Sequence, residues 1–118
     1  MENFTATRYA MQFAECDKTD KVYVDKYSTN DFLINLAEEA GELISAISKY
    51  NRANGYGPIT PVTPEAALEN LKEELSDTIA CGLLLAEKCG WLDDMIAWHK
   101  KKSIMCAKRI EEKNGEAE

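Results

Sequence analysis

Two long segments of this chain, residues 30–52 and 64–89, repeat their apolar residues every three or four positions. This spacing places the apolar side chains on one face of an α-helix and the polar side chains on the other. Between the two segments, residues 51–63 are dense in Gly, Pro and Asn, which predicts a loop. The chain is therefore predicted to be all-α, with two long helices at its centre. The residues of the two stripes are Phe32, Leu36, Ala40, Leu43, Ile47 and Tyr50 in the first helix, and Leu71, Leu75, Thr78, Gly82, Leu85 and Cys89 in the second.

The residues at the ends of these segments are of the types that begin and end helices. Thr29 or Asn30 can cap the first helix and Thr63 the second, because their side-chain oxygens accept hydrogen bonds from free backbone N–H groups. Pro64 suits the first helical position, and Gly90 suits the residue that follows the last turn. The boundaries of the central helices can thus be predicted from local chemistry.

The rest of the chain adds further helices. Residues 4–16 and residues 91–113 carry helical patterns, whereas the charged residues 17–29 predict a connection. We expect a four- to five-helix bundle in a single domain, residues 1–113, followed by a solvated tail, residues 114–118.

The composition limits the partners of such a bundle. The 118 residues include 21 Asp and Glu against 14 Lys and Arg, so the formal net charge is −7 and the pI is about 4.8. A hydrophobic content of 45% is enough to build a core. The acidic balance argues against a nucleic-acid polymer or an anionic membrane as partner, since both require a basic surface. An anionic ligand would need a cation to offset the charge of the protein.

The sequence also predicts where the protein resides. The longest apolar run, residues 79–86, is less than half of the roughly 18 residues that a membrane span needs. The first residues lack the basic and apolar regions of a signal peptide. The four cysteines form no C-x-x-C pair, so we expect reduced thiols and a cytoplasmic location.

An acidic pattern occurs once in each central helix. The segment LAEEAGEL (36–43) aligns with LKEELSDT (71–78) at an offset of 35 residues. On a helical wheel, each copy places two acids, three residues apart, on one flank of the apolar stripe, and a third acid points away. The flanking acids are Glu39 and Glu42 in the first copy and Glu74 and Asp77 in the second, and the outlying acids are Glu38 and Glu73.

Four carboxylates that converge from paired helices repel one another and stabilise a fold poorly. The arrangement becomes favourable when a hard divalent cation lies between them, and Mg²⁺, or Mn²⁺ in its place, prefers oxygen ligands of this kind. The alternative is a solvated acidic face with no ligand. A di-iron bundle is disfavoured, because it needs Glu-x-x-His on two helices and His99 is the sole histidine.

These motifs give the chain a family resemblance. Glu38-Glu39-x-x-Glu42 followed by Glu74-x-x-Asp77 resembles the MazG-type all-α nucleoside triphosphate pyrophosphohydrolases, over residues 30–90. The same superfamily includes dimeric dUTPases, dCTP pyrophosphatases and phosphoribosyl-ATP pyrophosphohydrolases. The resemblance implies Mg²⁺ ligands at Glu39, Glu42, Glu74 and Asp77. A further carboxylate, Glu38 or Glu42, would orient or deprotonate the attacking water.

The last predicted helix carries two basic residues on an apolar stripe. Lys102 and Arg109 could contact phosphate, or they could extend past the stripe into solvent. The predicted helix over residues 64–89 is apolar almost all round at residues 79–86, so a second subunit should cover this part. We therefore expect a homodimer or a homotetramer, as the resemblance also implies.

The resemblance implies a Mg²⁺-dependent enzyme that hydrolyses a nucleoside or deoxynucleoside triphosphate to the monophosphate and pyrophosphate. Two alternatives remain open. One is a catalytically silent helical oligomer that binds a nucleotide or a protein, and the other is a phosphoribosyl-ATP pyrophosphohydrolase.

Overall fold

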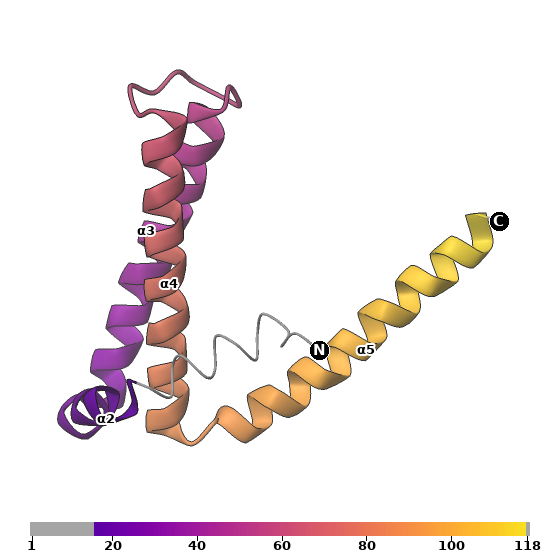
Figure 1. Ribbon diagram of the computed structural model, residues 1–118. Coiled ribbons are helices and arrows are strands. Elements are labelled where there is room, and N and C mark those ends of the chain that lie inside the picture. Colours follow the sequence, from indigo (N-terminus) through magenta and orange to yellow (C-terminus); the bar gives the residue numbers. More distant parts are fainter. Residues whose placement is uncertain (1–15, 118) are drawn as a thin grey trace.

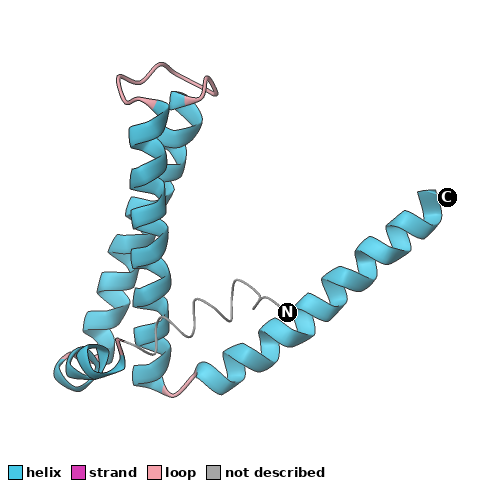
Figure 2. Ribbon diagram, viewed as in Figure 1, coloured by secondary structure: helices cyan, strands magenta, loops and turns pink. Residues whose placement is uncertain are grey.

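The computed structural model describes residues 16–117, and every regular element in that range is an α-helix. The predicted all-α class is thereby confirmed (Figures 1 and 2). The predicted helix over residues 4–16 lies, apart from Cys16, outside the described residues. The four helices are α2 (Asp17–Lys26), α3 (Thr29–Ala53), α4 (Pro64–Cys89) and α5 (Leu92–Ala117).

Helices α3 and α4 pack side by side as an antiparallel hairpin (Figure 1). The N-cap of helix α3 is Ser28, one residue before the predicted cap Thr29 and two before the alternative Asn30. The Ser28 hydroxyl accepts a hydrogen bond from the Asp31 N–H at 3.2 Å, and the Asp31 carboxylate accepts one from the Ser28 N–H at 2.9 Å. This reciprocal capping box satisfies two free backbone donors. The Ser28 backbone and hydroxyl bonds hold the pKa of Asp31 below its usual range.

Helix α4 has the predicted boundaries. The Thr63 hydroxyl accepts from the Ala66 N–H at 3.2 Å, and Pro64 occupies the first helical position. Gly90 ends the helix with φ 71° and ψ 31°, in the left-handed region where a residue without a Cβ is favoured.

Residues 17–26 form a helix, so the prediction of a connection over 17–29 is wrong for most of that range. The charges of this segment suit the helix dipole, with Asp17 and Asp20 in the first turn and Lys26 in the last. The Lys88 ammonium of α4 also donates to the Val24 carbonyl at 2.8 Å, close to the carboxyl end of α2. This tertiary contact adds to the favourable charge placement in a segment whose β-branched residues have weak helix propensity.

Helix α5 continues to Ala117, so the residues predicted as a tail are helical from 114 to 117. After Gly90 the helix leads away from the α3–α4 pair (Figure 1). Its side chains from Asp93 to Glu116 are all exposed. The Trp98 side chain, for example, is 65% exposed.

Small residues dominate the core between α3 and α4. Ile47 and Leu75, which the sequence places on the apolar stripes, are exposed, whereas Ala46, the neighbour of Ile47, is buried. No helix in the described part of the chain is long and apolar enough to cross a membrane. The buried residues are Phe32, Ala46, Ala67, Leu85 and Ala86.

Candidate metal centre

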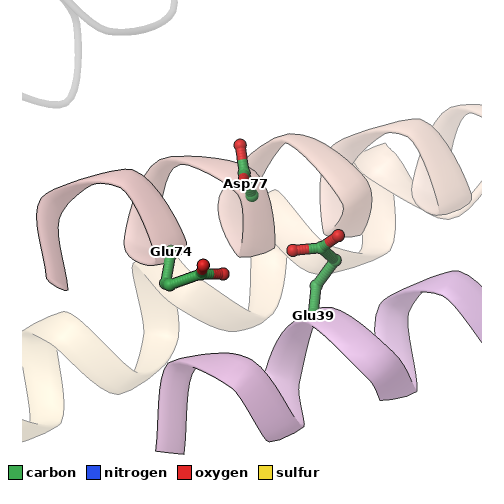
Figure 3. A group of neighbouring side chains, drawn as sticks. All are labelled: Glu39, Glu74 and Asp77. Carbon is green, nitrogen blue, oxygen red and sulfur yellow. The ribbon is translucent and has the colours of Figure 1, made fainter. Parts of the chain in front are cut away.

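The α3–α4 hairpin brings three of the predicted metal ligands together. One carboxylate oxygen from each of Glu39, Glu74 and Asp77 lies within 4.8 Å of the others. Figure 3 shows the Glu39 and Glu74 side chains extending towards each other from the facing helices. Glu39 and Glu74 are half-buried and Asp77 is exposed, so the group lies at the edge of the helix pair.

Thr78 fixes the two helices at the level of these acids. Its hydroxyl lies 2.8 Å from the carbonyl oxygen of Glu74, one turn earlier on α4, and 3.2 Å from the carbonyl oxygen of Glu39 on α3. The hydroxyl can therefore donate across the hairpin to the backbone of a candidate ligand. Thr78 follows Asp77 in sequence, so this contact joins the α4 backbone beside Asp77 to the α3 backbone at Glu39.

The electrostatics of the group favour protonation or a bound cation. Burial, followed by the negative charges of Glu42, Asp77 and Glu38, raises the pKa of Glu39. Burial, followed by a hydrogen bond and the charge of Glu42, raises the pKa of Glu74, with further contributions from Glu39 and Asp77. Each carboxylate thus destabilises the charged form of its neighbours.

Two carboxylate oxygens of the group have unused hydrogen-bonding capacity. The Oε2 atoms of Glu39 and Glu74 are buried and have no hydrogen-bond partner among residues 16–117. The ion pairs in this part of the chain, Lys21 with Asp25 and Lys72 with Glu69, do not involve the group. An all-oxygen donor set with buried, unpartnered oxygens fits a hard cation such as Mg²⁺ or Mn²⁺.

The other predicted site residues occupy three different places in the structure. Glu42 is outside the three-ligand group, yet it approaches Glu39 and Glu74 closely enough to raise the pKa of both. Glu38 lines a cavity between α2, α3 and α4. Lys102 and Arg109 line a separate hollow on α5, the helix that leads away from the hairpin (Figure 1). A single chain therefore does not bring these two basic residues to the acids.

Sequence reasoning missed a second pair of polar residues beside the acids. The Asn35 side-chain amide donates to the Cys81 sulfur at 3.3 Å, across the hairpin. Asn35 lies one turn before Glu39, and Cys81 lies one turn after Asp77. Burial and the charges of Glu39 and Asp77 raise the pKa of the Cys81 thiol. The sequence does contain a sign of this pair. Asn35 is four residues from Glu39 and Cys81 is four residues from Asp77, which places each on the same helix face as its acid.

Comparison with known proteins gives no relative for this chain. No family model, no curated protein and no solved structure matches it.

Proposed function

We propose that this chain is a Mg²⁺-dependent nucleotide pyrophosphohydrolase of the MazG type. The observation that carries the proposal is the convergence of Glu39, Glu74 and Asp77 within 4.8 Å across two helices. The two buried, unpartnered carboxylate oxygens add support, because a solvated acidic face would leave them hydrated. Glu39, Glu74 and Asp77 would hold the ion, and Glu42 is close enough to join them or to bind an ordered water.

The bound ion would neutralise the polyphosphate and lower the pKa of a nearby water. The residues of the chain then have separate tasks. Glu42, whose carboxylate approaches both Glu39 and Glu74, would accept a proton from the attacking water. Glu38, at the adjoining cavity, is the other candidate base. The water oxygen bonds to the α-phosphorus, the α–β bridging bond breaks, and the triphosphate yields a monophosphate and pyrophosphate.

Pyrophosphate release from a panel of nucleoside and deoxynucleoside triphosphates tests this proposal. Activity should require Mg²⁺ and disappear with EDTA. Glu39→Gln and Asp77→Asn should each abolish turnover while the circular dichroism spectrum stays helical. Glu73→Gln is the matched control, because it removes the same charge from α4 at a residue outside the group. Full activity in both ligand variants would contradict the proposal.

We propose in addition that the working form is a homodimer or a homotetramer. The radius of gyration is 18.0 Å, whereas a compact chain of this length has about 13.5 Å. Helix α5 exposes apolar side chains that the other residues of the range 16–117 leave uncovered, including Trp98, Ile104 and Ile110 at 60–65%. Light scattering coupled to size exclusion would measure the assembly, and a monomer at micromolar concentration would contradict this part of the proposal.

In such an assembly, Lys102 and Arg109 would contact the phosphates of a nucleotide held by another copy, because α5 of the same chain leads away from the acids. Mixing two inactive variants tests this arrangement. Glu39→Gln lacks the metal ligand, and Lys102→Ala/Arg109→Ala lacks the basic pair, so mixed assemblies should regain part of the activity. Subunit exchange is first verified independently. If the mixed assemblies then regain no activity, the two copies do not share the site as proposed.

A further inference from the structure

The charges of this chain are unevenly distributed between its helices. Residues 95–110, within α5, include five Lys and Arg and no Asp or Glu, whereas residues 17–89 include 13 Asp and Glu against seven Lys and Arg. The net charge of −7 therefore conceals a basic segment on the helix that leads away from the acidic hairpin (Figure 1). Complementary charges on two separate surfaces of one chain favour contact between copies of that chain.

The basic segment presents one face that combines charged and apolar side chains. Trp98 and Met105, at the centre of this face, are 65% and 43% exposed. On a helical wheel, Lys101 lies at one edge of the face, and Lys102 and Arg109 lie at the other. Trp, Met and Arg are residue types that are enriched in protein interfaces. These five residues are called the α5 basic face below.

A complementary surface lies beside the metal centre. A cavity of about 470 Å³ between α2, α3 and α4 is lined by three carboxylates, those of Asp20, Asp31 and Glu38, and by no Lys or Arg of the range 16–117. Its apolar lining includes Tyr23 and Tyr27, which remain 47% and 39% exposed. The cavity thus combines aromatic surface with negative charge, whereas the α5 basic face combines aromatic surface with positive charge.

The charged groups of both surfaces lack partners within a single chain. The ion pairs among residues 16–117 are Lys21 with Asp25 and Lys72 with Glu69, so neither the three cavity carboxylates nor the three basic residues of the α5 basic face are paired. The Oδ2 atom of Asp20 is buried and has no hydrogen-bond partner in the same range. A buried carboxylate oxygen without a donor is costly, and a Lys ammonium that enters the cavity would satisfy it.

The two surfaces are apart in one chain. After Gly90, α5 leads away from the hairpin, and its side chains from Asp93 to Glu116 are exposed (Figure 1). A second copy supplies a helix that the first copy does not bring to its own cavity. In a pair with two-fold symmetry, α5 of each copy lies on the cavity of the other, so the contact occurs twice. Such a pair covers both surfaces of both copies.

We propose that the α5 basic face of a second copy docks on this cavity, with Trp98 against the tyrosines and Lys101 donating to the Asp20 carboxylate. The proposal names the contact surface of the proposed assembly and rests on that assembly. Hydrolysis is no part of it, so the contact forms without Mg²⁺ and without nucleotide.

The docked helix also brings basic residues towards the acids of the other copy. With Lys101 turned towards α2, Lys102 and Arg109 at the opposite edge are turned towards Glu38 on α3. Glu38 directly precedes Glu39 of the metal centre. The contact therefore supplies a path by which Lys102 and Arg109 reach phosphates held by another copy.

Charge reversal tests the pairing in EDTA and without nucleotide. Asp20→Lys and Lys101→Glu each place like charges together, so each should raise the dissociation constant of the assembly at least about tenfold in analytical ultracentrifugation. Asp17→Lys is the control for α2, because Asp17 is outside the cavity lining. Lys100→Glu is the control for α5, because Lys100 lies on the opposite side of the helix. Both controls should stay within about twofold of the unchanged chain.

Trp98→Ala tests the apolar part of the contact without a change of charge. Trp98 is 65% exposed, so its loss leaves the fold of one chain intact even where a reversal at Asp20 disturbs it. This variant should raise the dissociation constant at least about thirtyfold. Ile96→Ala is the control, because Ile96 is 64% exposed and lies on the other side of α5. A Trp98→Ala variant that assembles as tightly as this control would overturn the proposal.

Mixing the two charge-reversed variants identifies the partner. In a mixed pair, the cavity reversed by Asp20→Lys meets the helix reversed by Lys101→Glu, and the second contact consists of the unchanged residues. The mixture should therefore assemble at least about fivefold more tightly than either variant alone. The double variant Asp20→Lys/Lys101→Glu should recover as well. Recovery in the double variant without recovery in the mixture would place α5 on the cavity of its own chain and overturn the proposal.

The remaining outcomes separate this contact from the proposed function. An assembly that neither reversal weakens would overturn the docking surface and leave the proposed assembly standing. A monomeric unchanged chain would overturn both. Recovery in the mixture, without Mg²⁺-dependent hydrolysis of any triphosphate, would overturn the proposed enzyme and leave the contact standing.

Discussion

The Thr78 hydroxyl is a sensitive point of the candidate metal centre, and Thr78→Val tests its role. Valine has nearly the same shape as threonine and removes only the hydroxyl. The lost contacts are those to the carbonyl oxygens of Glu74 at 2.8 Å and Glu39 at 3.2 Å. Both carbonyls lie within helices and keep their intrahelical hydrogen bonds, so the substitution leaves no unsatisfied acceptor.

The expected loss of stability is therefore small. One hydroxyl proton serves two acceptors, so the net loss should be about 1 kcal/mol. Such a loss lowers the Tm of a domain of this size by about 4 °C. The effect on the metal centre should appear as weaker Mg²⁺ binding, because the hydroxyl links the backbones that carry Glu39 and Glu74. Thr78 contacts the backbone and not a ligating carboxylate, so we expect a loss of affinity of up to about tenfold, the lower end of the range for partners bonded to the ligands themselves.

The assay combines thermal unfolding with titration of Mg²⁺ against pyrophosphate release. Thr78→Ser keeps the hydroxyl and should retain both the metal affinity and most of the stability, which makes it the matched control. If Thr78→Val required no more Mg²⁺ for half-maximal activity than the serine variant, the idea that this hydroxyl positions the ligands would be wrong.

Three further predictions follow from burial, capping and charge. The raised pKa values of Glu39 and Glu74 mean that their contribution to stability is fully present below their ordinary value of 4.5 and is lost as the pH rises through their folded values. Urea unfolding in EDTA should show this decline in the free energy of unfolding, and added Mg²⁺ should reverse it. The lowered pKa of Asp31 affects stability only at more acidic pH. A metal-free protein whose free energy of unfolding does not fall as the pH rises above 4.5 would contradict the raised pKa values. Leu85→Ala should cost about 2–5 kcal/mol in the same assay, because Leu85 is only 5% exposed, and a cost below about 1 kcal/mol would mean that the hairpin core is loosely packed. Ser28→Ala should cost about 1 kcal/mol through loss of the α3 cap and leave the Mg²⁺ requirement unchanged, so a changed requirement would show that the cap reaches the metal centre.

Local chemistry predicts the central hairpin well. The Thr63 cap, Pro64 and the left-handed Gly90 each act within one turn, so the sequence alone locates the ends of α4. The alignment of the acids follows from the 3.6-residue period together with the hairpin. Three of the four predicted ligands consequently converge as the wheel indicates, and Glu42 lies beside them.

Features that depend on tertiary contact could not be predicted in this way. Helix α2 has a sequence of charged and β-branched residues with weak helix propensity, and its contacts with α4, such as Lys88 to the Val24 carbonyl, are not visible in the local sequence. The cavity that Glu38 lines is formed where α2 lies against α3 and α4, so its lining residues from α2, such as Asp20 and Tyr23, do not stand out in the sequence. The wheel could not show that α5 carries Lys102 and Arg109 away from the acids, because the direction of a helix is set by the joint before it.

That joint, formed by Gly90 and Trp91, has a mechanical consequence. Helix α5 has 26 residues, so it is a rod of about 39 Å anchored at one end. A rotation of about 10° at Gly90 would displace the far end by roughly 7 Å, while the acids on α3 and α4, packed within the hairpin, would stay in place. The position of the acids and the direction of α5 can therefore vary independently. The geometry of the hairpin determines the arrangement of the acids, and the angle at the joint determines which surfaces of other molecules α5 can reach.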